Sequence, residues 1–236
     1  MTIDILTVLP ELLTGALDYS IVGRARARCI VDIHLRQLRD YTHDKRRTVD
    51  DYAYGPDAGM VLKPEPIFEA VEHLQAEGGA YDEIVYTAPD GELLTQALAT
   101  ELSLKPRLLI LCGHYKGVDQ RVRDHLVTRE VSIGDYILSG GELAAAVLVD
   151  TIVRLLPGAL GDATSALSDS FQEGLVSPPA YTRPENFRGW EVPAILRSGN
   201  FPEIAKWQLA EALRLTEARR PELLKQYWAR NSSHEE

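Results

Sequence analysis

Three short segments of this chain combine glycine residues with a preceding apolar run that is typical of a buried strand. They are Glu83–Gly91, Leu108–Arg121 and Val131–Leu143. Because glycine lacks a Cβ atom, peptide N–H and C=O groups can form the wall of a pocket there. In an open α/β sheet, the loops at the carboxyl ends of the strands build the ligand crevice. We therefore expect the three segments to form one binding site. A turn that only redirects the chain is the alternative for each segment taken alone.

Two charged residues outside these segments have types that could assist a reaction. Asp169 lies among small and polar residues, where its carboxylate could meet a substrate after the segment closes. Equally, Ser168 or Asp169 could cap a helix. Arg154 lies near the end of a long apolar helix, where a cation interacts favourably with the helix dipole and needs no further role. The residues alone leave these alternatives open.

Size and composition indicate a protein that folds without disulfides or metals. The chain has 236 residues, enough for one substantial core and a smaller second domain. Cys29 and Cys112 have no C-x-x-C partner, which argues against a zinc site or a disulfide framework and favours a reducing compartment. The first residues lack a basic signal-peptide region, and no stretch approaches the roughly 18 apolar residues of a membrane span. We expect a soluble, cytoplasmic protein without membrane contact.

The net charge of −10 argues against a nucleic-acid partner, but the distribution of charge argues for one. Basic groups mixed with aromatic side chains can bind phosphates and stack on unpaired bases. An ordinary solvated surface is the alternative. The N-terminal basic residues are Arg24, Arg26, Arg28, Arg36, Arg39, Lys45, Arg46 and Arg47. Those near the other end are Arg183, Arg188, Arg197, Lys206, Arg214, Arg219 and Arg220, which recur with Tyr181, Phe187, Trp190 and Trp207.

Strand-like and helix-like segments alternate over the first two thirds of the chain, which predicts an α/β domain with a mostly parallel sheet. The expected strands are Ile3–Leu9, Val31–Leu35, Ile84–Thr87, Arg107–Leu111 and Arg129–Ile133. The expected helices lie near Pro66–Gln75, Glu92–Glu101 and Glu142–Leu156.

The texture of the sequence changes after Leu156. Pro157–Ser170 is small and polar and reads as a flexible linker. A proline-rich stretch follows, and then a helix over Glu203–Arg219 is predicted. On it Ala205, Leu209, Ala212 and Thr216 share one face. We expect a small C-terminal helical domain.

Nearly the whole chain resembles the bacterial tRNA (guanine-N1)-methyltransferases of the TrmD family, members of the SPOUT class. The matching motifs include RDYTHDKRRTVDD, LCGHYKGVDQRV, VSIGDYILSGGEL, RLLPGALG, YTRPE and RRPELL, in the family's order. The resemblance implies a knotted, mostly parallel sheet flanked by helices that binds S-adenosylmethionine, over residues 1–160. It further implies a flexible linker over 161–175, a tRNA-binding helical domain over 176–236, and a homodimer.

The resemblance also implies roles for individual residues. Asp169 matches the proposed general base, which would remove the proton from guanine N1, and Arg154 matches the cation that faces the guanine and stabilises charge on O6. No metal-ligand motif is present, and a dependence on Mg²⁺ stays open. The positions that match the family's cofactor-binding residues or flank them are Tyr86, Pro89, Gly113, Tyr115, Ile133, Gly134, Asp135, Tyr136, Ile137, Leu138, Gly140 and Gly141.

Two loops depart from the commonest family pattern. The motif CGHYKG stands where many members have CGRYEG, so Lys116 replaces an acidic residue. The motif YGPDAGM stands where the family commonly has a glycine-richer loop, and Pro56 and Asp57 are the changed residues. The leading hypothesis is methylation of N1 of the guanosine 3′ of the anticodon, guanosine 37 of tRNA. A tRNA-binding homologue with impaired catalysis is the alternative. A nicotinamide dehydrogenase would need the G-x-G-x-x-G motif, which is absent.

Overall fold

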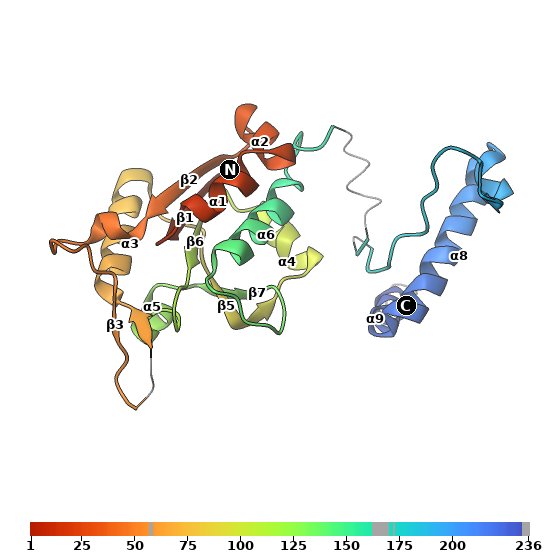
Figure 1. Cartoon of the computed structure of the whole chain (residues 1–236). Coiled ribbons are helices and arrows are strands. Elements are labelled where there is room, and N and C mark those ends of the chain that lie inside the picture. Colours follow the sequence, from red (N-terminus) through yellow and green to blue (C-terminus); the bar gives the residue numbers. More distant parts are fainter. Residues whose placement is uncertain (57–58, 162–169, 172, 233–236) are drawn as a thin grey trace. The chain divides into compact units, whose positions relative to one another are not determined.

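The computed structural model describes residues 1–56, 59–161, 170–171 and 173–232 (Figure 1). The chain divides into two compact units, Met1–Ala163 and Thr164–Glu236. The linker predicted over 161–175 falls mostly outside the described residues, so its boundaries stay a prediction.

The N-terminal unit is built on one five-stranded parallel sheet. Its strand order is β2-β1-β6-β5-β7, and every neighbouring pair is parallel. The prediction of an α/β domain with a mostly parallel sheet is therefore confirmed, while the knot stays a prediction. The strands are β1 (Thr2–Thr7), β2 (Asp32–Gln37), β5 (Glu83–Leu93), β6 (Arg107–Cys112) and β7 (Arg129–Ser132).

Helices cover both faces of this sheet (Figure 1). One core cluster joins the inner strands to α1 (Glu11–Leu17), α2 (Ser20–Ala27), α4 (Gln96–Ser103) and α6 (Glu142–Val153). The cluster on the other face uses α3 (Pro64–Gly78), α5 (Gln120–His125) and η1 (Leu38–Tyr41). Because both faces are buried, β6 and the first half of β5 in the middle of the sheet are nearly continuous buried runs, as expected for a parallel sheet.

The segment after Thr87 differs from the prediction. A helix was expected over Glu92–Glu101, but Glu92 and Leu93 pair with Val131 and Ser132 as part of β5. The register shifts between Thr87 and Glu92, so the Pro-Asp-Gly segment forms a bulge and the chain then rejoins the sheet. The helix begins later because the Thr95 side chain accepts a hydrogen bond from the Leu98 N–H and caps it.

A small antiparallel ribbon of β3 (Asp50–Tyr52) and β4 (Met60–Leu62) lies beside the loop that follows β6. The Lys116 N–H donates to the Met60 carbonyl at 3.1 Å, and the Leu62 N–H donates to the Gly117 carbonyl at 3.0 Å. The ribbon is therefore attached through its backbone to one of the three glycine-bearing segments.

The C-terminal unit contains a short hairpin of β8 (Asn186–Phe187) and β9 (Trp190–Glu191), then η2 (Ala194–Arg197), α8 (Phe201–Arg219) and α9 (Pro221–Ser232). The prediction that four residues of α8 share one apolar face is confirmed for burial at only two of them. Ala212 and Thr216 are buried, but Ala205 and Leu209 are exposed. Thr216 donates to the Ala212 carbonyl and accepts from the Val176 N–H at 2.9 Å, which anchors the preceding extended segment to this helix.

Candidate functional site

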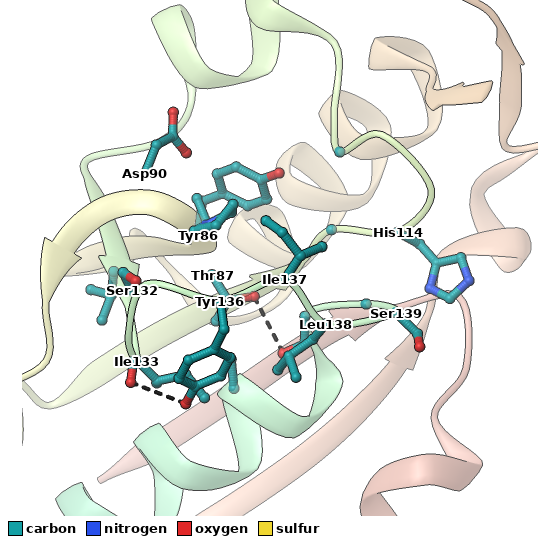
Figure 2. Close-up of a pocket in the computed structure, with 18 of the residues that line it drawn as sticks. Tyr86, Thr87, Asp90, His114, Ser132, Ile133, Tyr136, Ile137, Leu138 and Ser139 are labelled. Carbon is teal, nitrogen blue, oxygen red and sulfur yellow. Dashed lines mark hydrogen bonds between the residues drawn. The ribbon is translucent and has the colours of Figure 1, made fainter. Parts of the chain in front are cut away.

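A pocket of about 450 Å³ lies at the carboxyl ends of β5, β6 and β7 (Figure 2). Its walls come from the bulge after Thr87, the loop Gly113–Gly117 and the loop Ile133–Gly141. These are the three segments expected to form one site, and loops at the carboxyl ends of parallel strands meet at the same edge of a sheet. Ile137 and Leu138 lie near the middle of the view in Figure 2, with His114 to one side and Tyr136 to the other.

The back of the pocket is backbone rather than side chain. At Gly141, an added Cβ would lie 2.9 Å from the Gly113 nitrogen and 3.0 Å from the Cys112 Cα, and closer still to the Thr87 hydroxyl. The Gly141 N–H donates to the Gly113 carbonyl at 2.7 Å, and Thr87 Oγ1 donates to the Gly141 carbonyl at 3.3 Å. Glycine is required here because two loops touch through their main chains.

The loop Ile133–Gly141 folds back on itself at Gly134. The φ angle of Gly134 is +147°, and a Cβ there would lie 2.5 Å from the Tyr136 ring. The Tyr136 hydroxyl donates to the Ile133 carbonyl at 3.2 Å (Figure 2). Ile137 and Leu138 then line the pocket with substantial exposed area, which an apolar ligand surface could cover.

A buried carboxylate lies behind the pocket. Glu142 is 1% exposed, and its Oε1 accepts a hydrogen bond of 2.7 Å from the Thr7 hydroxyl. Its Oε2 lies 3.9 Å from Nδ1 of His114, a buried nitrogen without a hydrogen-bond partner among the described residues. Together with burial, the charge of Glu142 raises the pKa of the Cys112 thiol. Glu142 thus links β1 to the loop that follows β6.

The outer wall is held by an ion-pair network centred on Arg123 of α5. Its guanidinium donates to Glu130 through Nε and Nη2, with Nε to Oε1 at 2.7 Å. Nη2 also donates to Asp90 at 2.7 Å. It also lies 5.6 Å from the Tyr86 ring centroid. The hydrogen bond from Arg123 lowers the pKa of Asp90, and burial raises the pKa of the Tyr86 phenol. Arg123 therefore ties the bulge to β7.

Of the predicted cofactor residues, all except Asp135 line this pocket. Asp135 is exposed and lies outside the lining. Asp169, together with Ser168, lies outside the described residues. Arg154 is the C-cap residue of α6 and is half-buried. The pocket contacts the opposite, N-terminal end of that helix through Gly141 and Ala144.

Lys116 lines the pocket and also packs on the β3–β4 ribbon. A Cβ at Gly59 would lie 3.1 to 3.3 Å from three carbons of the Lys116 side chain, so glycine leaves room for the lysine stem. Pro56, the described residue of the other departure from the family pattern, is exposed, and Asp57 lies outside the described residues.

Sequence reasoning missed several residues of this site. Asp90 belongs to the Pro-Asp-Gly motif and could have been included with it. Arg123 and Glu142 carried no signal, because they read as ordinary charged residues of helices. The pocket-lining residues not predicted are Thr87, Ala88, Asp90, His114, Lys116, Gly117, Arg123, Val131, Ser132, Ser139 and Ala144.

Many of the basic residues considered as a nucleic-acid footprint are engaged within the protein. Arg36 pairs with the buried Asp4 at 2.7 Å, and Arg47 with Asp40. In the C-terminal unit, four basic side chains each pair with a neighbouring glutamate. These pairs are Arg197–Glu185, Lys206–Glu203, Arg214–Glu211 and Arg220–Glu222.

The described part of the chain offers neither a metal-ligand cluster nor a membrane-spanning helix. None of its groups of three or more His, Cys, Asp or Glu residues could hold a metal ion. None of its helices is long and apolar enough to cross a membrane.

Comparison with known proteins gives concordant matches over the length of the chain. The family model described as tRNA (Guanine-1)-methyltransferase TrmD matches residues 1–226. A tRNA (guanine-N(1)-)-methyltransferase of Porphyromonas gingivalis is 55% identical over 225 residues, which cover 95% of this chain and 100% of the relative. Proteins of the same name from Flavobacterium johnsoniae and Bacteroides thetaiotaomicron are 53% and 54% identical. They cover 96% and 95% of this chain and 100% and 99% of their own lengths.

Proposed function

This chain belongs to the TrmD family of tRNA (guanine-N1)-methyltransferases, and we propose that it transfers a methyl group from S-adenosylmethionine to N1 of the guanosine 3′ of the anticodon, guanosine 37. The observation that carries the proposal is the pocket at the strand ends, whose lining includes every position that the family resemblance assigns to the cofactor except Asp135.

The pocket has the properties that a bound adenosyl group needs. Gly113 and Gly141 give the pocket a wall of main chain, because a Cβ at either position would collide with Tyr86, Thr87 or neighbouring backbone. Ile137 and Leu138 offer apolar contact, and main-chain groups of the three loops offer hydrogen bonds that fix orientation. S-adenosylmethionine supplies an activated methyl group, so the protein mainly has to align the reacting atoms.

The chain's own contribution to the chemistry is the preparation of the nucleophile. Guanine N1 carries a proton and is a poor nucleophile until that proton leaves. We assign the removal of this proton to the Asp169 carboxylate, and the stabilisation of negative charge on O6 to the Arg154 guanidinium.

The length of α6 supports a site shared between two copies of this chain. The helix has 12 residues and is therefore about 18 Å long. Arg154 follows its last residue, whereas the pocket contacts its first turn. The reaction needs Arg154 and the cofactor pocket at the same guanine. They come together when Arg154 and Asp169 of one protomer meet the pocket of its partner.

An exposed apolar surface beside the pocket supports the same homodimer. Leu12 of α1 and Leu143 and Val147 of α6 are 54%, 57% and 45% exposed, and the two helices pack against each other. Exposed apolar side chains on two packed helices are typical of an interaction site, and closed two-fold dimers are the commonest homo-oligomers.

The direct test is methyl transfer to undermodified tRNA, with the modified nucleoside identified after digestion. Asp169→Asn keeps size and polarity but removes basicity. We expect it to lower the transfer rate by a factor of about 10² to 10⁴ and to leave the affinity for S-adenosylmethionine nearly unchanged. A parent enzyme that binds tRNA but transfers no methyl group would favour the impaired homologue instead.

The shared site has its own test, because a mixed dimer of two inactive chains can regain one site. A Gly141→Val chain supplies Asp169 but has a distorted pocket, and an Asp169→Asn chain supplies a pocket but has no base. Co-expression with two affinity tags isolates the mixed dimer. Recovered methyl transfer supports sharing between protomers, and a mixed dimer as inactive as either parent shows that each chain uses its own Asp169.

A further inference from the structure

The β8–β9 hairpin is closed by a tight two-residue turn. Phe187 and Trp190 lie directly opposite each other, and the turn between them is Arg188–Gly189. Both turn residues have positive φ angles, +56° and +87°, as in the hairpin turns whose twist matches that of the strands. The Gly189 N–H donates to Asn186 Oδ1 at 3.0 Å, which closes the turn.

Both aromatic side chains of this hairpin are largely exposed to solvent. Phe187 is 53% and Trp190 is 70% exposed, and their ring centroids are 6.2 Å apart with an interplanar angle of 45°. Neither ring belongs to a core cluster of the described residues. The cross-strand contact stabilises the hairpin, but it leaves most of the indole surface without a protein contact. Large exposed aromatic groups mark a surface that binds another molecule.

The charge at the tip indicates what that molecule is. The Arg188 guanidinium carbon lies 5.1 Å from the Phe187 ring centroid, and among the described residues the guanidinium makes no ion pair with a carboxylate. The nearby carboxylates of Glu185 and Glu191 are engaged by Arg197 and Asn186. An uncompensated planar cation beside the Phe187 ring, on a hairpin that also exposes Trp190, suits a nucleotide, which presents a flat base next to a phosphate.

We propose that the tip of this hairpin is a stacking platform for an unpaired nucleotide of the tRNA substrate. Trp190 and Phe187 contact the base, and Arg188 contacts an adjoining phosphate. The proposal rests on the proposed function, since it names a contact to the same substrate. It adds a binding site for one single-stranded base outside the methyl-transfer pocket, which needs no particular base identity because every base has a flat face.

The test is the affinity for unmethylated tRNA measured over a range of salt concentrations for Trp190→Leu, Phe187→Leu and Arg188→Gln. We expect each leucine variant to weaken binding roughly tenfold without changing the salt dependence, the effect of losing one base stack. Arg188→Gln reduces the slope of log affinity against log salt by about one phosphate contact. Trp228→Leu is the matched control, because Trp228 on α9 is 52% exposed and lies outside the hairpin. We expect it to change neither quantity.

Three further measurements make the outcomes decisive. Trp190→Phe keeps a stacking face and should recover most of the affinity lost in Trp190→Leu, whereas a purely structural defect would persist. Unchanged tRNA affinity in both leucine variants overturns the platform, and so does a shift of the variants toward monomers in sedimentation, since the surface would then hold a second copy of the chain. Absence of methyl transfer by the parent enzyme overturns the proposed function instead.

Discussion

The two units of this protein differ in how closely their candidate binding surfaces are packed against the rest of the chain. Around the pocket of the N-terminal unit, a Cβ at Gly141 would collide with neighbouring main chain. In the C-terminal unit, a Cβ at Gly189 or Gly199 would meet nothing within 4 Å, and aromatic side chains stand open. A site for a small ligand is formed in advance by contacts within one chain. On the function proposed above, the exposed aromatic groups of the C-terminal unit would be covered only when a large nucleic acid binds.

The largest effect should come from forcing apart the two loops that form the back of the pocket. Gly141→Val places branched carbon atoms against Thr87 and the Gly113 backbone, and we expect it to lower the affinity for S-adenosylmethionine roughly 100-fold or more in a calorimetric titration. Gly15→Ala is the control, because a Cβ there meets nothing within 4 Å and alanine favours the helix. Gly134→Ala strains the other loop through its positive φ angle and should also weaken binding. Normal titrations for both pocket variants would refute this location of the cofactor site.

The next effect concerns the buried carboxylate that joins the pocket loops to β1. Glu142→Gln removes the charge that accepts from Thr7 and faces His114. Because hydrogen bonds to charged groups contribute about 1.5–3 kcal/mol, we expect the affinity for S-adenosylmethionine to fall about tenfold and the Tm to fall by several degrees. Glu72→Gln on the exposed face of α3 should alter neither. A variant that melts earlier but binds normally would show that Glu142 supports the fold without supporting the site.

The same comparison shows how far the sequence predicts this protein. The three glycine-bearing segments and the parallel sheet were predictable because apolar runs and glycine turns are local signals. The start of α4 was not, because pairing of Glu92 with Val131 across the sheet overrides the helical pattern. Arg123 and Glu142 were missed for a similar reason, since their partners are far away in sequence or contact them only in the folded sheet.

In the C-terminal unit, periodicity was a weaker guide. Ala205 and Leu209 share a face with Ala212 and Thr216 on α8, yet only the latter two are buried. A short helical unit has too little core to cover a full apolar stripe, so the rest of the stripe remains exposed. Charge clusters were also misleading, because an arginine in the sequence does not show whether a glutamate one turn away neutralises it.

A third prediction therefore separates paired from unpaired arginines in the C-terminal unit. Arg183 is exposed and makes no ion pair with a described residue, whereas Arg214 donates to Glu211 at 2.6 Å. We expect Arg183→Glu to weaken tRNA binding roughly fivefold or more and to reduce its salt dependence by about one phosphate contact. Arg214→Glu should have the smaller effect, and both should spare cofactor binding. Equal losses would show that the intramolecular pair opens when tRNA binds, and a salt-independent affinity would contradict phosphate binding altogether.

The smallest effect should be a dependence of stability on pH at the pocket wall. The hydrogen bond from Arg123 lowers the pKa of Asp90 in the folded protein, so folding favours the ionised carboxylate. Its contribution is fully present above the unfolded pKa of about 3.9 and is lost as the pH falls through the lower folded value. Asp90 is largely exposed, so solvent screens the pair and the effect is modest.

Denaturant unfolding should show a stability difference between the parent and Asp90→Asn at about pH 6 that shrinks toward about pH 3. In an Arg123→Gln background the difference at about pH 6 should be much smaller, because the main hydrogen-bond donor to Asp90 is gone. A difference that persists unchanged at low pH, or that survives at full size without Arg123, would mean that Asp90 stabilises the bulge through an interaction other than its pair with Arg123.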